Sequence, residues 1–215
     1  MTLPHLIFDL DNTLYPPSRG VVERVDARIN HFMIERLGMA PDVAGSLRAR
    51  YRDAHGTTLN GLMLHHDIEP DDYLAAVHEI AVEELLDPDP ALGAMLAALP
   101  HQKVIFTNGS TSHAERVLAC LDVRIHFSAV FSLECVAYVP KPERAAFETV
   151  LDRLAVAASD CVFVDDRVDN LATARALGMR TVLVGDEHDE PRDDVDGTIA
   201  SILDLSALLT RWGSS

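Results

Sequence analysis

Short apolar segments alternate with helical patterns from residue 91 onward. Each apolar segment has the length of a strand, and each pattern between them has the period of a helix. Strands that consist almost entirely of apolar residues are typical of a parallel sheet whose two faces are both covered by helices. The alternation therefore predicts an α/β fold with a doubly wound parallel sheet.

Five apolar segments are predicted to be the strands of that sheet. They cover residues 6–10, 103–106, 129–133, 161–164 and 181–184. The predicted helices of this region cover residues 110–121, 143–154, 169–177 and 199–212. The acidic stretch 186–196 is predicted to be a solvated loop.

The segment between the first two predicted strands contains helical patterns and no convincing strand. Its predicted helices cover residues 21–37, 42–54, 62–66 and 70–86, and the stretch 56–61 interrupts them. A connection of this length in a compact protein is expected to have a structure or function of its own. The sequence therefore predicts two domains: an α/β core of residues 1–15 and 89–215, and an inserted all-helical cap of residues 16–88.

Asp9 and Asp11 lie at the carboxyl end of the first predicted strand. Ligands of open α/β sheets bind at that edge, and the two-residue period of a strand directs both side chains to the same face. At about 4 Å, two unit charges repel by roughly 4 kcal/mol at an effective dielectric constant near 20. The pair therefore favours a hard divalent cation with oxygen ligands. Taken alone, Asp9 also fits a turn residue after a strand.

Polar residues also follow the second predicted strand. Thr107, Asn108 and Gly109 stand between that strand and the start of a helix. The unpaired N–H groups of a helix start bind anions, and the two polar side chains add donors, so this turn suits a phosphate group. The same stretch also fits a simple helix cap at Ser110.

Lys141 lies between Pro140 and Pro142, just ahead of a predicted helix. The two prolines restrict the backbone on both sides of the lysine. A fixed ammonium group would offset the repulsion between an attacking carboxylate and a phosphate dianion. A single lysine also fits an ordinary surface position, but its place between the third and fourth strands favours the site.

Asp165 and Asp166 stand at the carboxyl end of the fourth predicted strand. Two adjacent carboxylates at this position repel each other unless a cation lies between them. Asp169, which opens the next helix, fits a helix cap instead. The acidic pair is therefore a candidate for metal binding, and Asp169 is not.

In chain order, these residues resemble the motifs of the haloacid dehalogenase-like (HAD) phosphatases. The motifs are Asp9-x-Asp11-x-Thr13, Thr107-Asn108, Lys141-Pro142 and Asp165-Asp166. The helical insertion is similar to the C1 cap of that superfamily. The stretches FDLDNTLYP, YRDAHGTTLNGLM, HHDIEPDDY and VDDRVDNL resemble its pyrimidine 5′-nucleotidase branch. One departure is Arg167, where many relatives carry a serine after the acidic pair.

The resemblance implies a Mg²⁺-dependent hydrolase of phosphate monoesters that acts through an aspartyl-phosphate. It makes Asp9 the nucleophile and Asp11 the general acid and base. The implied Mg²⁺ ligands are Asp9, the backbone carbonyl of Asp11, and Asp166, with Asp165 as a nearby or alternative ligand. The implied phosphate-binding residues are Thr107, Asn108 and Lys141.

The resemblance also implies nucleoside 5′-monophosphates as substrates, with pyrimidine nucleotides preferred. Side chains that could stack on a base or hydrogen-bond to it cluster near the predicted cap loop, although each also fits a packing or surface position. They are Arg50, Tyr51, His55, Thr57, Thr58, Met63, His65 and His66. Alternative substrates are a sugar phosphate, phosphoglycolate and pyridoxal phosphate.

Other chemistries of similar folds are distinguished by a few residues. Dehalogenases do not need an acid at the position of Asp11, and phosphonate cleavage needs a cap lysine, which residues 16–88 lack. A phosphomutase uses the same residues as a phosphatase and stays an alternative. A phospho-receiver module stays a remote one, since receivers carry an adjacent acidic pair on the first strand and no large insertion.

Composition limits the partners and the location. A formal net charge of −16, from 34 acidic and 18 basic residues, argues against nucleic acids and anionic membranes. Cys120, Cys135 and Cys161 have no zinc-like spacing and are predicted to be reduced. No apolar stretch reaches the roughly 18 residues of a membrane span, and no leader precedes the first strand. These features predict a cytoplasmic protein with a small-molecule substrate; they do not predict its oligomeric state.

Overall fold

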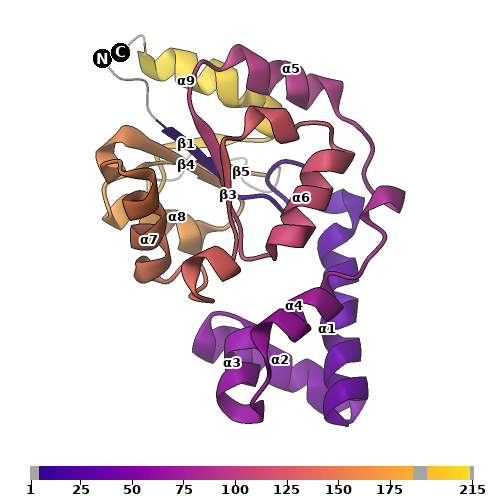
Figure 1. Cartoon of the computed structure of the whole chain (residues 1–215). Helices are drawn as coiled ribbons and strands as arrows, with labels where there is room; N and C mark the ends of the chain where they lie inside the picture. The colour runs from indigo at the N-terminus through magenta and orange to yellow at the C-terminus, as the bar shows by residue number, and fades with distance from the viewer. Residues whose placement is uncertain (1–4, 186–192, 214–215) are drawn as a thin grey trace.

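The computed structural model describes residues 5–185 and 193–213 (Figure 1). Six parallel strands form one sheet in the order β3-β2-β1-β4-β5-β6. They are β1 (His5–Phe8), β2 (Lys103–Phe106), β3 (Ala129–Phe131), β4 (Cys161–Asp165), β5 (Arg180–Val184) and β6 (Gly197–Ile199). The five predicted strands are confirmed, and β6 is an additional short edge strand. Residues 186–192 of the predicted acidic loop lie outside the described residues.

Helices cover both faces of the sheet. One face packs against α5 (Pro90–Ala98), α6 (Thr111–Cys120) and α9 (Leu205–Gly213), and the other against α7 (Arg144–Leu154) and α8 (Val168–Ala176). Successive residues of β1 alternate between the two hydrophobic clusters: Leu6 and Phe8 belong to one, and Ile7 belongs to the other. Burial on both faces explains the apolar composition of the strands and confirms the doubly wound sheet.

Of the helices between β1 and β2 in the chain, the first four α-helices gather on one side of the core (Figure 1). They are α1 (Val21–Leu37), α2 (Pro41–His55), α3 (Thr58–His66) and α4 (Pro70–Val77). Their apolar side chains form a third cluster, in which the rings of Phe32 and Tyr73 meet edge to face with centroids 5.1 Å apart. A separate cluster supports the proposed cap domain of residues 16–88.

Two predicted helix boundaries in the cap are wrong. The helix predicted over 70–86 ends at Val77, because the apolar residues beyond it, among them Val82 and Leu86, pack into a cluster of the α/β core. The helix predicted to begin at residue 62 begins at Thr58, where the side chain of Thr57 accepts a hydrogen bond from the N–H of Asn60 at 3.1 Å.

Two general sequence expectations can be compared with the structure. Cys120, Cys135 and Cys161 are free thiols, as their number and spacing predicted. Among the described helices, none combines the length and the apolar character that a membrane crossing requires.

Candidate active site

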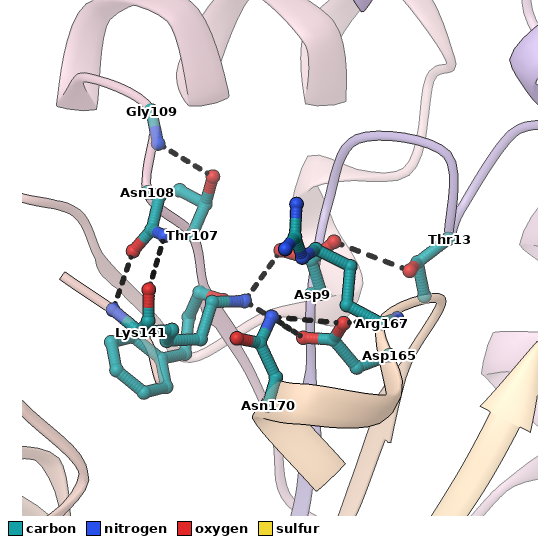
Figure 2. A network of polar contacts seen from close by, with 10 residues as sticks. Asp9, Thr13, Thr107, Asn108, Gly109, Lys141, Asp165, Arg167 and Asn170 are labelled. Carbon is teal, nitrogen blue, oxygen red and sulfur yellow. Dashed lines mark hydrogen bonds and ion pairs between the residues drawn. The ribbon is translucent and has the colours of Figure 1, made fainter. Parts of the chain in front are cut away.

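The carboxyl ends of β1, β2 and β4 meet at one edge of the sheet, because β1 lies between the other two strands. Asp9 follows β1, Thr107 follows β2, and Asp165 ends β4. Lys141 reaches the same place from the segment before α7, and Figure 2 shows these side chains converging. The structure thus brings together the four segments that the sequence analysis selected, at the kind of edge where open α/β sheets bind ligands.

Lys141 is the central cation of this edge. Its Nζ donates hydrogen bonds to Oδ1 of Asp9 at 2.6 Å, to Oδ2 of Asp165 at 3.0 Å and to the carbonyl of Phe106 at 2.7 Å. Burial by itself lowers the pKa of an ammonium group, but the carboxylates of Asp165 and Asp9 outweigh burial and raise the pKa of Lys141. Lys141 therefore carries its charge at neutral pH although its side chain is only 1% exposed.

Asn108 fixes the backbone that carries Lys141. Its Oδ1 accepts from the N–H of Lys141 at 2.8 Å, and its Nδ2 donates to the carbonyl of Lys141 at 2.9 Å. The neighbouring Thr107 is buried, and its Oγ1 accepts from the N–H of Gly109 at 2.9 Å (Figure 2). The turn after β2 and the lysine segment are thus held to each other by a pair of reciprocal hydrogen bonds.

Asp9, Asp165 and Asp166 form a cluster in which one carboxylate oxygen of each residue lies within 4.8 Å of the other two. Burial, together with the charges of Asp165 and Asp166, outweighs Lys141 and raises the pKa of Asp9 well above its usual value. Burial and the charge of Asp165 likewise raise the pKa of Asp166 to about 6. Three mutually repelling oxygen ligands with one ammonium group between them match what a hard divalent cation requires.

The two aspartates at the end of β4 have different surroundings. The carboxylate of Asp165 accepts hydrogen bonds from Nζ of Lys141 and from the N–H of Arg167, the latter at 2.8 Å. Nδ2 of Asn170 lies 2.9 and 3.0 Å from its two oxygens and donates to them. Asp166 instead lines the cavity at the edge of the sheet. Asp165 is therefore arranged to hold its protein neighbours, and Asp166 is the member of the pair that a ligand in the cavity meets.

Asp169 does not cap α8, contrary to the prediction. The helix starts after Arg167 with no side-chain cap bond, and Asp169 lies exposed in the first turn, 3.7 Å from a guanidinium nitrogen of Arg167. A carboxylate there still stabilises the helix through its dipole. Arg167, the departure from the family pattern, lines the cavity with its side chain.

Asp11 is held separately from the other carboxylates. Its Oδ1 accepts from Nε2 of His113 at 2.8 Å and from the hydroxyl of Tyr15. Burial raises the pKa of this carboxyl, but His113 and Tyr15 together outweigh burial and lower it to about 2. Asp11 is therefore ionised at neutral pH. The hydroxyl of Thr13 donates to Oδ2 of Asp9 at 3.2 Å.

The candidate site opens into a cavity of about 290 Å³. Its lining includes Asp9, Asp11, Thr107, Asn108, Lys141 and Asp166. A second cavity of about 260 Å³ shares His78, Asn108 and Arg167 with the first and extends along the cap helices. The two cavities form one path from the carboxylates to the cap.

Only part of the predicted substrate set lines this path. Thr57 and Thr58 do, but the lining of the two cavities does not include Arg50, Tyr51, His55, Met63, His65 or His66. Tyr51 is buried in the cap cluster, and its hydroxyl is 2.9 Å from Nε2 of His66. Nε2 of His55 is 3.3 Å from Nε2 of His65 in an exposed contact.

Several residues of the site were missed by the sequence analysis. They are Tyr15, Arg48, Arg52, Tyr73, His78, His113 and Asn170. One signal was available for His113: it lies in the first turn of the helix that follows Thr107 and Asn108. The first turn of a helix that begins at the carboxyl edge of a sheet places its side chains near that edge. The cap residues carried no such signal.

Residues 3–178 match the family of haloacid dehalogenase-like hydrolases. The chain belongs to the HAD-like hydrolases. Phosphate metabolism protein 8 of Saccharomyces cerevisiae is 26% identical to this HAD-like hydrolase over 193 residues, 82% of this chain and 60% of the yeast protein. A phosphatase of Mycobacterium tuberculosis is 29% identical over 110 residues, 51% of this chain and 48% of that protein. The HAD-like hydrolase thus spans less than two thirds of either relative.

Solved structures of the family share the fold of this HAD-like hydrolase. A HAD phosphatase from Thermococcus onnurineus aligns with a TM-score of 0.64 and 19% identity over 96% of this chain and 98% of that chain. A 2-haloacid dehalogenase from Pseudomonas syringae aligns with a TM-score of 0.62 and 20% identity over 98% of this chain and 100% of that chain. YfnB from Bacillus subtilis, solved with magnesium bound, aligns with a TM-score of 0.63 and 15% identity over 97% of this chain and 99% of that chain. Since one fold serves a phosphatase and a dehalogenase, the site residues must distinguish the two activities.

Proposed function

We propose that this HAD-like hydrolase is a Mg²⁺-dependent phosphatase of small phosphate monoesters that acts through an aspartyl-phosphate. One observation carries the proposal: two carboxylates with different partners line the same cavity. Asp9 is bound to Lys141, and Asp11 is bound to His113 and Tyr15. Ester hydrolysis through a covalent intermediate needs a nucleophile and a separate acid and base.

The oxygen cluster fits a magnesium ion. Asp9 and Asp166 offer oxygens close together, and burial together with neighbouring carboxylates raises the pKa of each. In this proposal Asp9, Asp166 and the backbone carbonyl of Asp11 would hold the ion, with Asp165 beside them. When bound, Mg²⁺ supplies positive charge that offsets the carboxylates and the phosphoryl oxygens.

In the first step, a carboxylate oxygen of Asp9 attacks phosphorus as the bond from phosphorus to the ester oxygen breaks. Asp11 gives a proton to the departing oxygen. Asp11 is ionised in the substrate-free structure, but a phosphate dianion beside it raises its pKa because like charges repel. Lys141, Thr107 and Asn108 contact the non-bridging oxygens of the phosphoryl group.

In the second step, water attacks the phosphorus of the aspartyl-phosphate and releases inorganic phosphate. Asp11, now ionised, takes the proton of that water, and Asp9 is regenerated as a carboxylate. Because phosphate monoesters hydrolyse extremely slowly, with enzymes accelerating the reaction by up to about 10²¹-fold, all of these groups must act together. The buried position of Lys141 strengthens its effect on the phosphoryl group, since water screens it little.

We propose nucleoside 5′-monophosphates, with pyrimidine nucleotides preferred, as the substrates. Support comes from the sequence resemblance and from the second cavity, which has a volume of about 260 Å³ and is lined by cap residues. Thr57 and Thr58 offer hydroxyls there, and Arg52 offers a guanidinium group.

A panel of phosphate esters tests this proposal. With Mg²⁺, we expect UMP and CMP to release inorganic phosphate faster than AMP, GMP, sugar phosphates, phosphoglycolate and pyridoxal phosphate, and a chelator to abolish the release. Faster turnover of another ester would replace the substrate class and leave the phosphatase chemistry. Rearranged ester without phosphate release would identify a mutase, and halide release from 2-haloacids would identify a dehalogenase.

A further inference from the structure

His113 is the buried partner of the proposed acid and base. Its side chain is 1% exposed, and its Nε2 lies 2.8 Å from Oδ1 of Asp11. The ring reaches the carboxylate past Gly109, where an added Cβ would lie 3.1 Å from Cδ2 of His113 and 3.7 Å from Oδ2 of Asp11. The absence of a side chain at Gly109 therefore leaves the space that this contact occupies.

The two ring nitrogens of His113 have different surroundings. Its Nδ1 is buried and has no hydrogen-bond partner among the described residues. Its Nε2 faces an oxygen of the ionised Asp11 carboxylate, which can only accept a hydrogen bond, so Nε2 carries a proton. His113 is therefore the donor in its hydrogen bond to Asp11.

A second histidine, from the cap segment, holds the ring of His113. The two rings stack with centroids 4.6 Å apart and planes 26° from parallel. His78 is itself fixed, because its Nδ1 donates to the carbonyl of Leu74 near the end of α4 at 3.0 Å. The cap therefore contacts the acid and base through two stacked rings.

The hydrogen bonds of Asp11 divide its two oxygens. Oδ1 accepts from both His113 and Tyr15, whereas no hydrogen bond from the described residues reaches Oδ2. Oδ2 is thus the oxygen left to exchange a proton with a ligand in the cavity that Asp11 lines. Because two hydrogen bonds hold Oδ1, the carboxylate cannot rotate Oδ2 away from the cavity without breaking both of them.

We propose that His113 is the positioning residue for Asp11, and that His78 of the cap keeps the His113 ring in place. This rests on the proposed function, because Asp11 must be the proton donor to the leaving oxygen. Loss of His113 should slow some esters more than others. An ester with a poor leaving group needs the proton from Asp11, whereas p-nitrophenyl phosphate releases a stable anion without it. Loss of positioning should therefore affect the first kind of ester only.

The test compares kcat/KM for the best alkyl ester of the substrate panel with that for p-nitrophenyl phosphate. This constant reports formation of the aspartyl-phosphate and not its hydrolysis, which is common to both esters. We expect His113→Asn, whose short amide does not reach Asp11, to lower the alkyl-ester value on the order of 10²-fold. The aryl-ester value should fall less than about 3-fold, since it needs no acid.

His113→Gln is the matched control, because its longer amide places an N–H close to the position of Nε2. We expect it to restore the alkyl-ester value to within about 10-fold of wild type, and His78→Ala to show the same selective loss to a smaller degree. His31→Asn, on the exposed face of α1, should leave both constants unchanged. Thermal melting identifies any variant that fails to fold. If His78→Ala does not fold, the comparison of His113→Gln with His113→Asn decides whether His113 positions Asp11.

Equal losses on the two esters, or equal behaviour of His113→Gln and His113→Asn, would overturn the positioning role while leaving the phosphatase intact. A wild-type protein that hydrolyses neither ester would instead refute the proposed function itself. The two failures are distinguished by the wild-type measurement alone.

Discussion

Replacing Lys141 by methionine probes the electrostatics of the site most directly. Its ammonium nitrogen is 2.6 Å from an oxygen of Asp9 and 3.0 Å from an oxygen of Asp165. At an effective dielectric constant of 20, each contact corresponds to an attraction of about 6 kcal/mol. Most of this attraction is offset by the desolvation of the charges, several kcal/mol for each ion.

Removing the lysine leaves the desolvated carboxylates without their counter-charge. Breaking a buried ion pair in this way lowers the free energy of unfolding by about 3–5 kcal/mol. We expect that loss for Lys141→Met in chelator-treated protein at neutral pH, measured by urea denaturation. The loss should shrink as the pH falls below about 6, because Asp166, whose pKa is raised to about 6, then takes up a proton and repels the other carboxylates less. Added Mg²⁺ should recover part of it.

The chain offers a matched control in Lys103, the other buried lysine. Its Nζ donates to the carbonyls of Leu99 at 2.6 Å and His101 at 2.9 Å and bonds no carboxylate among the described residues. Lys103→Met should therefore lower the free energy of unfolding by about 1–2 kcal/mol, with no dependence on pH or Mg²⁺. If Lys141→Met behaves like Lys103→Met, then the ammonium group does not balance the carboxylate cluster.

Three further predictions concern two aspartates of the site and two glycines of the cap. Asp9→Asn should abolish phosphate release and leave the circular dichroism spectrum and the melting temperature at or above wild type, since a buried charge with a raised pKa is removed. Asp166 binds its proton more tightly when folded, from the usual 3.8 to about 6, so its contribution lowers the free energy of unfolding as pH rises from about 4 to 6. Relative to metal-free Asp166→Asn, wild type should lose about 2–3 kcal/mol across that range, and a constant difference in urea titrations would contradict this. Gly61→Ala should lower the free energy of unfolding by about 1–3 kcal/mol, because the new Cβ overlaps the ring of Tyr51, whereas Gly45→Ala in open space should raise it by about 0.5–1 kcal/mol. Equal melting shifts for the two alanines would refute the overlap.

The core strands and the main polar groups of the site could be predicted because both depend on local sequence. A strand buried on two faces must be apolar along its whole length. The first charged residue, such as Asp9 or Asp165, therefore marks the end of the strand in the sequence. The order of the strands then brings those ends to one edge. No knowledge of side-chain packing is needed for that step.

The cap and the contacts of Asp11 could not be predicted in this way. The spacing of apolar residues does not show which domain they pack against. Val82 was therefore predicted to lie in a cap helix, although it belongs to a cluster of the α/β core. Tyr51 has the composition of a base-stacking residue, but it packs against Gly61 inside the cap. The contact between Asp11 and His113 joins residues far apart in the chain and exists only through tertiary packing.

The position of β1 in the middle of the sheet has a consequence for folding. Both of its neighbours, β2 and β4, come later in the chain, and the whole helical insertion separates β1 from the nearer one. Pairing of such distant segments requires large loops to close, which slows folding. We therefore expect the nascent chain to acquire its catalytic groups together and late, once β4 has been synthesised and has added to β1, so that truncation before β4 leaves a chain with no partial activity.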